Sequence, residues 1–195
     1  MKNLASITLF TCAALLGSLA TVSAHADDAS CKPVADSVAR MARTPYHEVS
    51  TVDGKPFEKI YTTTTLSMRM AGKWTTVPMT PKEILDAVRE TGSFSGCKML
   101  RTEMVDGQLA TVYAAHRVSP GTSYPSEDSQ VWISASGLTL KSVSDSQAGG
   151  RKVHAESHMT FDNVQAPTGA NIMPSCPIRR SDGLPRNYCR SSMTS

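Results

Sequence analysis

The stretch SQVWISASGLTLKSVSDSQAGGRKVHAESHMTFDNV, residues 129–164, decides the fold class of this chain. It predicts three successive β-strands, Gln130–Ala135, Leu138–Ser144 and Arg151–Phe161, with breaks at Gly137 and at 147–150, because glycine enters the φ > 0 conformations that tight hairpins need. Side chains alternate along the last strand, which is typical of a strand with one packed and one wet face. One face carries Val153, Ala155, Ser157, Met159 and Phe161, and the other carries His154, Glu156, His158 and Thr160.

The residues before this stretch predict two helices and five further strands. A helix is expected at Cys31–Arg43, and a second one starts with Thr80-Pro81-Lys82-Glu83, the residue order of a capping box. The strands are expected at Tyr46–Val52, Phe57–Met70, Trp74–Val77, Cys97–Val105 and Gln108–Val118. Short connections between strands favour antiparallel hairpins. The chain is therefore expected to be α+β, a curved antiparallel β-sheet (half-barrel) covered by two helices.

The first residues are typical of a secretory signal peptide. A short positive lead is followed by an apolar run at 4–19, which is too short to span a bilayer, and then by Ala24-His25-Ala26. We expect residues 1–26 to be the signal peptide, 27–167 the half-barrel domain and 168–195 a disulfide-pinned basic tail. The expected compartment is the periplasm.

Four cysteines remain once the signal peptide is removed: Cys31, Cys97, Cys176 and Cys189. An even number in an exported protein predicts two disulfides with three connectivities open. We favour Cys31–Cys97 and Cys176–Cys189, because the second bond would close a short loop rich in proline and glycine. A four-thiolate zinc site is the alternative, but the sequence lacks the paired C-x₂-C spacing of such sites.

Positive charge is concentrated in the tail. From Pro174 onward the tail contains one acid, Asp182, and four arginines, Arg179, Arg180, Arg186 and Arg190. The rest of the mature chain therefore has a net charge of about −1. A body without a basic stripe argues against nucleic-acid binding. The tail arginines suit peripheral contact with an anionic membrane surface.

The sequence offers little recognisable catalytic chemistry. No G-x-S-x-G motif and no glycine-rich phosphate loop occur, so we expect a non-enzyme without a cofactor. His154 and His158 stand about 13 Å apart on an extended strand, too far to share one metal ion easily. His154 and Glu156 with His116 from another strand form the alternative, a metal-dependent hydrolase.

The apolar strand positions are the candidate ligand-binding residues. Ile60, Leu66, Met68 and Met70 are expected on one face of a single long strand, and methionine suits an adaptable apolar site. A half-barrel has more concave surface than two short helices cover. The full candidate set is Ile60, Leu66, Met68, Met70, Trp74, Val112, Trp132, Leu138 and Leu140, and plain core packing is the alternative role of each.

Several short motifs resemble one family. They are a cysteine-bearing first helix, Pro45-Tyr46-His47, Gly72-Lys73-Trp74, Asp106-Gly107 and Asn163-Val164-Gln165-Ala166-Pro167, with the strand pair from Trp132 to Lys141 as the most specific part. Over residues 31–167 they resemble proteobacterial periplasmic proteins with the lipoprotein-carrier (LolA-like) half-barrel fold. The resemblance implies a concave apolar surface that cradles acyl chains.

Three hypotheses follow. The first is a soluble periplasmic non-catalytic protein that binds a lipid, an acyl chain or another hydrophobic small molecule. The second is an interaction module whose sheet edge or arginine tail docks a protein of the cell envelope. The third is the metal-dependent hydrolase on His154, Glu156 and His116.

Overall fold

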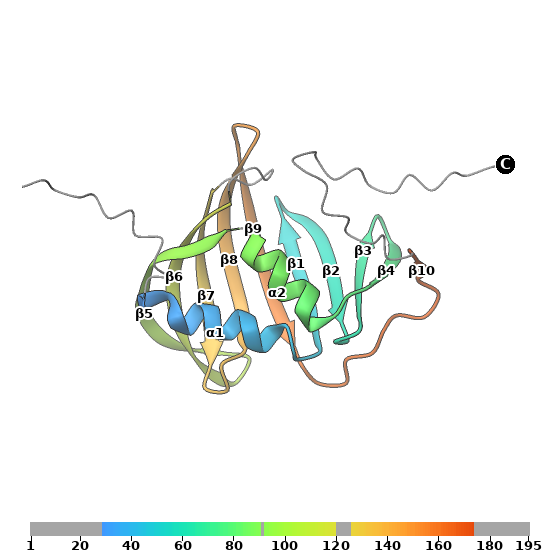
Figure 1. Cartoon of the computed structure of the whole chain (residues 1–195), viewed down its shortest axis with the longest axis horizontal. Coiled ribbons are helices and arrows are strands. Elements are labelled where there is room, and N and C mark those ends of the chain that lie inside the picture. Colours follow the sequence, from blue (N-terminus) through green and yellow to red (C-terminus); the bar gives the residue numbers. More distant parts are fainter. Residues whose placement is uncertain (1–28, 91, 120–125, 174–195) are drawn as a thin grey trace, which may run out of the picture.

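The structure is a computed structural model, and it describes residues 29–90, 92–119 and 126–173. One ten-stranded sheet organises these residues, in the order β10-β4-β3-β2-β1-β9-β8-β7-β6-β5 (Figure 1). All neighbouring strands are antiparallel except β10 and β4. The elements are η1 (Ala29–Cys31), α1 (Lys32–Met41), β1 (Tyr46–Val52), β2 (Lys55–Tyr61), β3 (Thr65–Met70), β4 (Lys73–Pro78), α2 (Pro81–Glu90), β5 (Ser93–Val105), β6 (Gln108–Val118), β7 (Ser126–Ser134), β8 (Thr139–Ala148), β9 (Arg151–Thr160) and β10 (Asn171–Ile172).

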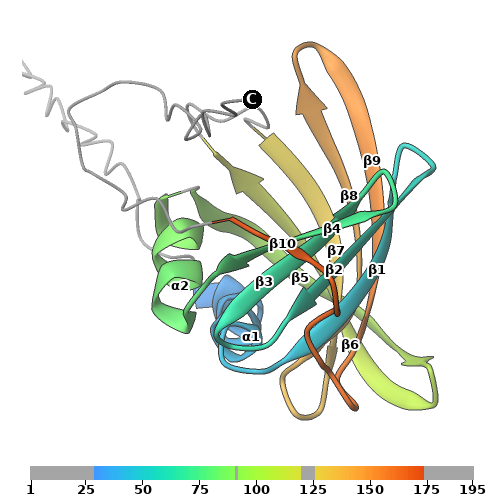
Figure 2. The same ribbon diagram turned by 90° about the vertical axis from the view of Figure 1, so that its right-hand side faces the viewer.

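The sheet is curved and unclosed, with β5 and β10 as its two end strands. Figure 2 shows it wrapped around α1 and α2, which both lie on its concave side. The expected half-barrel is thus confirmed in its sheet, whereas the two short helices cover the concave side only in part. The expected signal peptide and the pair Cys176–Cys189 lie outside the described residues, and the sheet extends past the expected domain end at 167 to take in β10.

The three strands of the organising stretch are confirmed as β7, β8 and β9. Trp132 of β7 lies directly opposite Lys141 of β8. The turn between β7 and β8 contains Gly137 at φ 80°, a conformation that favours glycine. Strand β8 is longer than expected, since it continues to Ala148, whereas β9 ends at Thr160, one residue before its expected end.

The single strand expected at Phe57–Met70 is wrong, because β2 and β3 form a hairpin there. The turn at 62–64 contains threonines rather than the usual glycine or asparagine, and Thr63 adopts φ 71°. Hydroxyl groups hold it: Thr62 Oγ1 lies 2.7 Å from Thr65 Oγ1 and accepts a hydrogen bond from the Thr65 amide at 3.2 Å. Threonine is otherwise a strand residue, so the sequence pattern gave no sign of this turn.

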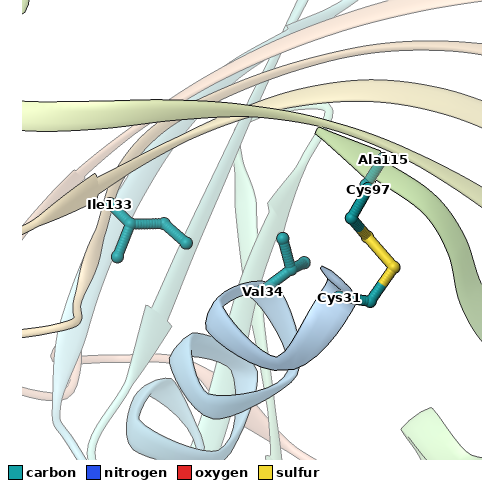
Figure 3. Packing of buried hydrophobic residues seen from close by; sticks show 5 residues of the cluster. All are labelled: Cys31, Val34, Cys97, Ala115 and Ile133. Atoms are coloured by element: carbon teal, nitrogen blue, oxygen red, sulfur yellow. A yellow bond between two sulfur atoms is a disulfide. The ribbon is translucent and has the colours of Figure 1, made fainter. Parts of the chain in front are cut away.

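Hydrophobic side chains pack on both faces of the sheet. On the concave face Val34 of α1 meets Ala115 of β6 and Ile133 of β7, beside the disulfide (Figure 3). The second cluster lies on the outer face, because its strand residues alternate with those of the first cluster. It consists of Val105, Ala110, Val112, Trp132 and Leu140, with Val143 and Phe161 packed against it.

Helix α1 is fixed to the sheet at three points. The expected disulfide Cys31–Cys97 joins its N-terminal end to β5. The hydroxyls of Ser37 and Thr139 hydrogen bond at 2.8 Å, and both residues are buried. The buried Tyr61 hydroxyl donates to the carbonyl of Ala42 at 2.8 Å. These contacts hold α1 over the part of the concave face formed by β5 to β8.

Candidate functional site

The concave face of β2, β3 and β4 keeps apolar surface that the protein does not bury. Directly opposed residues of neighbouring strands share a face, and Tyr61 lies opposite Leu66, which lies opposite Val77. Met68, two residues further along β3, shares that face. Leu66, Met68 and Val77 are only half-buried. We call Tyr61, Leu66, Met68 and Val77 the apolar floor.

Helix α2 lies on the same side of the sheet as the apolar floor (Figure 2). Its apolar side consists of Ile84, Leu85 and Val88, and none of the three is fully buried. A ten-residue helix of this kind gains most of its stability by burying its apolar side. The partial burial leaves apolar surface on both the helix and the sheet.

The start of α2 is set by the predicted capping box. The Thr80 amide donates to the Glu83 carboxylate at 2.7 Å, and the Glu83 amide donates to the Thr80 hydroxyl at 3.3 Å. The bond from the Thr80 amide, followed by that from its hydroxyl, lowers the pKa of Glu83. The pKa of Tyr61 is raised by burial, then by Tyr46 and by the negative charge of Glu83.

Next to the apolar floor the concave face contains a partly buried ion pair. Lys59 Nζ lies 2.5 Å from a Glu48 carboxylate oxygen, and the Ser157 hydroxyl donates to the other oxygen at 3.1 Å. Burial alone lowers the pKa of Lys59, but Glu48 and Tyr46 outweigh it, so the pKa lies above its usual value. Burial raises the pKa of Tyr46, which Lys59 opposes. A ligand here would meet charge beside apolar surface.

The centre of the concave face is lined by serines rather than by apolar side chains. Ser50 lies opposite Ser157, which lies opposite Ser142. In the next row Ser144 lies opposite Ser129. The apolar concave surface that the family resemblance implied is therefore interrupted by polar side chains at its centre. Apolar side chains on this face lie on β2 to β4, at the contacts of α1 and on β9, where Val153, Ala155 and Met159 flank Ser157.

The candidate ligand-binding residues are divided between the two faces. Leu66 and Met68 belong to the apolar floor, and Leu138 lies in the β7–β8 turn near the end of α1. The backbone of Met70 pairs with Lys73 at the end of β3, and its side chain lies outside what the structure describes. The residues on the outer face are Ile60, Trp74, Val112, Trp132 and Leu140.

The hairpin explains why Ile60 and Leu66 lie on opposite faces. In one continuous strand, residues an even number apart would share a face, as the sequence analysis assumed. In the observed hairpin Ile60 lies opposite Ser67, and Leu66 lies opposite Tyr61. Because of the turn, even-numbered residues of β2 lie on the outer face, whereas even-numbered residues of β3 lie on the concave face.

Trp132 helps to build the outer-face cluster. It is 5% exposed, and its indole N–H donates to the Glu103 carboxylate. The Lys141 ammonium and the Arg101 guanidinium lie 5.3 and 5.7 Å from the ring centre. The hydrogen bond from the Trp132 indole lowers the pKa of the Glu103 carboxyl group, and the hydrogen bond from Arg101 lowers it further by a smaller amount. The indole is thus occupied by contacts within the protein.

The histidines proposed for a metal site are not brought together. His116 Nδ1 pairs with Asp128 at 2.7 Å, and His154 Nδ1 pairs with Asp145 at 2.8 Å. Strands β7 and β8 lie between them, which separates the two backbones by about 14 Å. Glu156 pairs with Lys141 at 2.5 Å instead. Among the residues that the structure describes, no group of three or more His, Cys, Asp or Glu side chains is arranged to hold a metal ion.

Fold and site together define a half-barrel whose concave face is only partly covered and is apolar on one side. Within the described ranges, no helix is long and apolar enough to cross a membrane. No protein-family model and no curated protein matches the chain.

Fourteen chains of solved structures match the protein. The lipoprotein LppX of Mycobacterium tuberculosis is 13% identical, with a TM-score of 0.43 over 72% of this chain and 99% of that one. LprF from Mycobacterium bovis is 12% identical, with a TM-score of 0.44 over 73% and 97%. NE2245, a LolA-superfamily protein from Nitrosomonas europaea, is 10% identical, with a TM-score of 0.19 over 65% and 91%.

Proposed function

We propose that the protein is a non-catalytic periplasmic binding protein for a hydrophobic or amphiphilic molecule, held between α2 and the apolar floor. The observation that carries the proposal is the incomplete burial of Ile84, Leu85 and Val88 on the helix and of Leu66 and Met68 on the sheet. Each methylene group that leaves water in such a site contributes about 0.8 kcal/mol. An acyl chain would bury both surfaces at once.

The polar part of the concave face favours an amphiphile over a plain hydrocarbon. Glu48, Lys59 and the central serines border the apolar floor, and a hydrocarbon would cover them without replacing their contacts with water. An amphiphile can place its polar part there. The disulfide Cys31–Cys97 supports an oxidising compartment and therefore export.

Native mass spectrometry of the protein purified from a periplasm tests this proposal. We expect additional mass of a few hundred daltons that is lost after denaturation in organic solvent. Leu66→Glu should abolish that mass, since it places a carboxylate on the apolar floor. Val49→Glu is the matched control, because Val49 is 54% exposed on the outer face. A bare protein, or equal ligand loss in both variants with unchanged thermal stability, would contradict the proposal.

A second candidate function, docking to an envelope protein, is favoured by the β5 edge. Strand β5 ends the sheet, and apolar side chains on the β5–β6 hairpin are exposed: Met99 (59%), Met104 (62%) and Leu109 (60%). Such a strand can pair with an extended segment of another protein. Chemical crosslinking from position 99 in intact cells would identify a partner. If only lipid were bound and no crosslink formed, this candidate would fail.

A further inference from the structure

A cavity of about 610 Å³ lies between the C-terminal end of α1 and the turn that joins β7 to β8. Arg40, in the last turn of the helix, and Arg43, just after it, both line this cavity and are both exposed. Neither arginine forms an ion pair with another residue in the part of the chain that the structure describes. Two guanidinium groups are thus available to a ligand.

The remaining charge at the cavity is already neutralised. Asp36 also lines it, but its carboxylate lies 2.5 Å from the Lys32 ammonium. A carbonyl at the end of the helix is occupied as well, because that of Arg40 accepts bonds from the Arg43 amide and the Thr44 hydroxyl, both at 2.9 Å. The charges of the lining residues sum to +1, and to +2 when Lys32, the partner of Asp36, is counted with them.

The β7–β8 turn is shaped to receive the Arg40 side chain. A Cβ atom at Gly137 would come within 2.7 Å of both Cδ and Nε of Arg40. The absence of a side chain at Gly137 lets the guanidinium lie across the turn. Ser136 adds a hydroxyl to the lining, while Ala39 and Leu138 add apolar surface. Charge, hydroxyl and apolar groups thus meet in one cavity.

We propose that this cavity binds a phosphate ester group through Arg40 and Arg43. The planar guanidinium bonds phosphate oxygens in pairs, which makes arginine well suited to this ligand. The apolar wall at Leu138 and Ala39 favours a phosphate that carries carbon over inorganic phosphate. A phospholipid headgroup is one source of such a group and free phosphate is the other. The lipid source rests on the proposed function, whereas the phosphate site itself does not.

Arginines at the end of a helix also stabilise it by their interaction with the helix dipole. Arg89, in the last turn of α2, has the same position relative to its helix and serves as the matched control. A purely structural role would change the thermal stability of Arg40→Ala or Arg43→Ala and leave phosphate affinity unaltered. Both quantities should therefore be measured on every variant.

Calorimetric titration of the full mature protein tests the proposal with three probes: dihexanoyl phosphatidylglycerol, dihexanoyl phosphatidylcholine and inorganic phosphate. We expect the wild type to bind phosphatidylglycerol, and the double variant Arg40→Ala with Arg43→Ala to bind it about tenfold or more weakly. Arg89→Ala should bind as the wild type does. The pair Arg40→Lys with Arg43→Lys should lose part of the affinity, because it keeps the charge and lacks the planar fork.

Each outcome decides one point. Unchanged phosphatidylglycerol affinity in the double alanine variant overturns the site. Equal affinity of the wild type for inorganic phosphate and for phosphatidylglycerol assigns the site to free phosphate. Dodecyl maltoside, an uncharged amphiphile, separates this proposal from the proposed function: its binding should be lost in Leu66→Glu and kept in the double alanine variant. If Leu66→Glu binds it normally, the hydrophobic site fails while the phosphate site stands.

Discussion

The two helices have the same length and a similar amphipathic pattern, yet the sheet holds them very differently. Both are ten residues long. Helix α1 buries Val34 and Ser37 and is tied down by a disulfide, whereas α2 buries no residue completely. Amphipathicity therefore predicted that each helix would face the sheet, without predicting how tightly. In the proposed function α1 is scaffold, and α2 borders the ligand.

The largest expected effect is the loss of the bond that fixes α1. In the double variant Cys31→Ser with Cys97→Ser, removal of a cross-link across 66 residues should destabilise the protein by about 4 kcal/mol, because the unfolded chain regains its freedom. Urea unfolding followed by circular dichroism measures this difference. A loss below about 1 kcal/mol would mean that α1 is held by packing alone.

Matched valine substitutions compare the two helices directly. Val34→Ala should cost about 2 kcal/mol, since Val34 is 2% exposed and its removal leaves a cavity beside Ala115 and Ile133. Val88→Ala should cost less than about 1 kcal/mol, because Val88 is only half-buried. The same urea experiment gives both values. Equal costs would show that α2 is packed as firmly as α1 and leaves no room for a ligand.

The hydrogen bond from Tyr61 links the end of α1 to the apolar floor. Tyr61→Phe removes the donor and leaves the buried Ala42 carbonyl without it, which should cost about 1 to 2 kcal/mol. Thermal unfolding of this variant, with and without the bound amphiphile, measures the effect. Stabilisation by the ligand should be retained, since the aromatic ring remains. Its disappearance would show that the hydroxyl binds the ligand.

The ion pair of the concave face should give a smaller, pH-dependent effect. The folded-state pKa values of Lys59 and Tyr46 are both raised, so the folded protein holds these protons more tightly than the unfolded chain does. This stabilisation is present below the unfolded values, near pH 10, and is lost as pH rises through the folded values.

Melting temperatures between pH 8.5 and 11.5 test this prediction. The wild type should lose stability above about pH 10, and Lys59→Met should show a shallower loss, because Lys59 no longer titrates there while Tyr46, Tyr61 and ordinary surface groups still do. Identical profiles would contradict the coupling of Lys59 to Glu48.

Local sequence signals predicted most of the elements but could not assign the faces of the sheet. The strands Tyr46–Val52 and Gln108–Val118 were predicted with their observed bounds, because each ends at a recognisable turn. The Thr62–Thr64 turn had no such mark, and missing it placed Ile60 on the same face as Leu66. Trp132, Val112 and Leu140 were recognised as apolar sheet residues, but alternation within one strand does not reveal which face is concave.

The cavity at the end of α1 contained only one residue that the sequence analysis had selected, Leu138. Arg40 and Arg43 were not among the candidate site residues; they lie within the helix expected at Cys31–Arg43. Both arginines line a cavity beside the turn containing Gly137. This turn lies almost a hundred residues away in the chain and adjoins them only after folding. No sequence spacing could have suggested this contact.

The sequence by itself determined the class of fold and the two helices, and it predicted an export signal and two disulfides, because all of these depend on local pattern and on cysteine number; the pair Cys31–Cys97 was only the favoured one of three connectivities. Tertiary structure alone decided which apolar residues face the helices, how firmly each helix is held and which charged groups stay unpaired. The physical reason is that alternation and propensity act within a few residues. Burial and pairing depend on strand register between segments far apart in the chain.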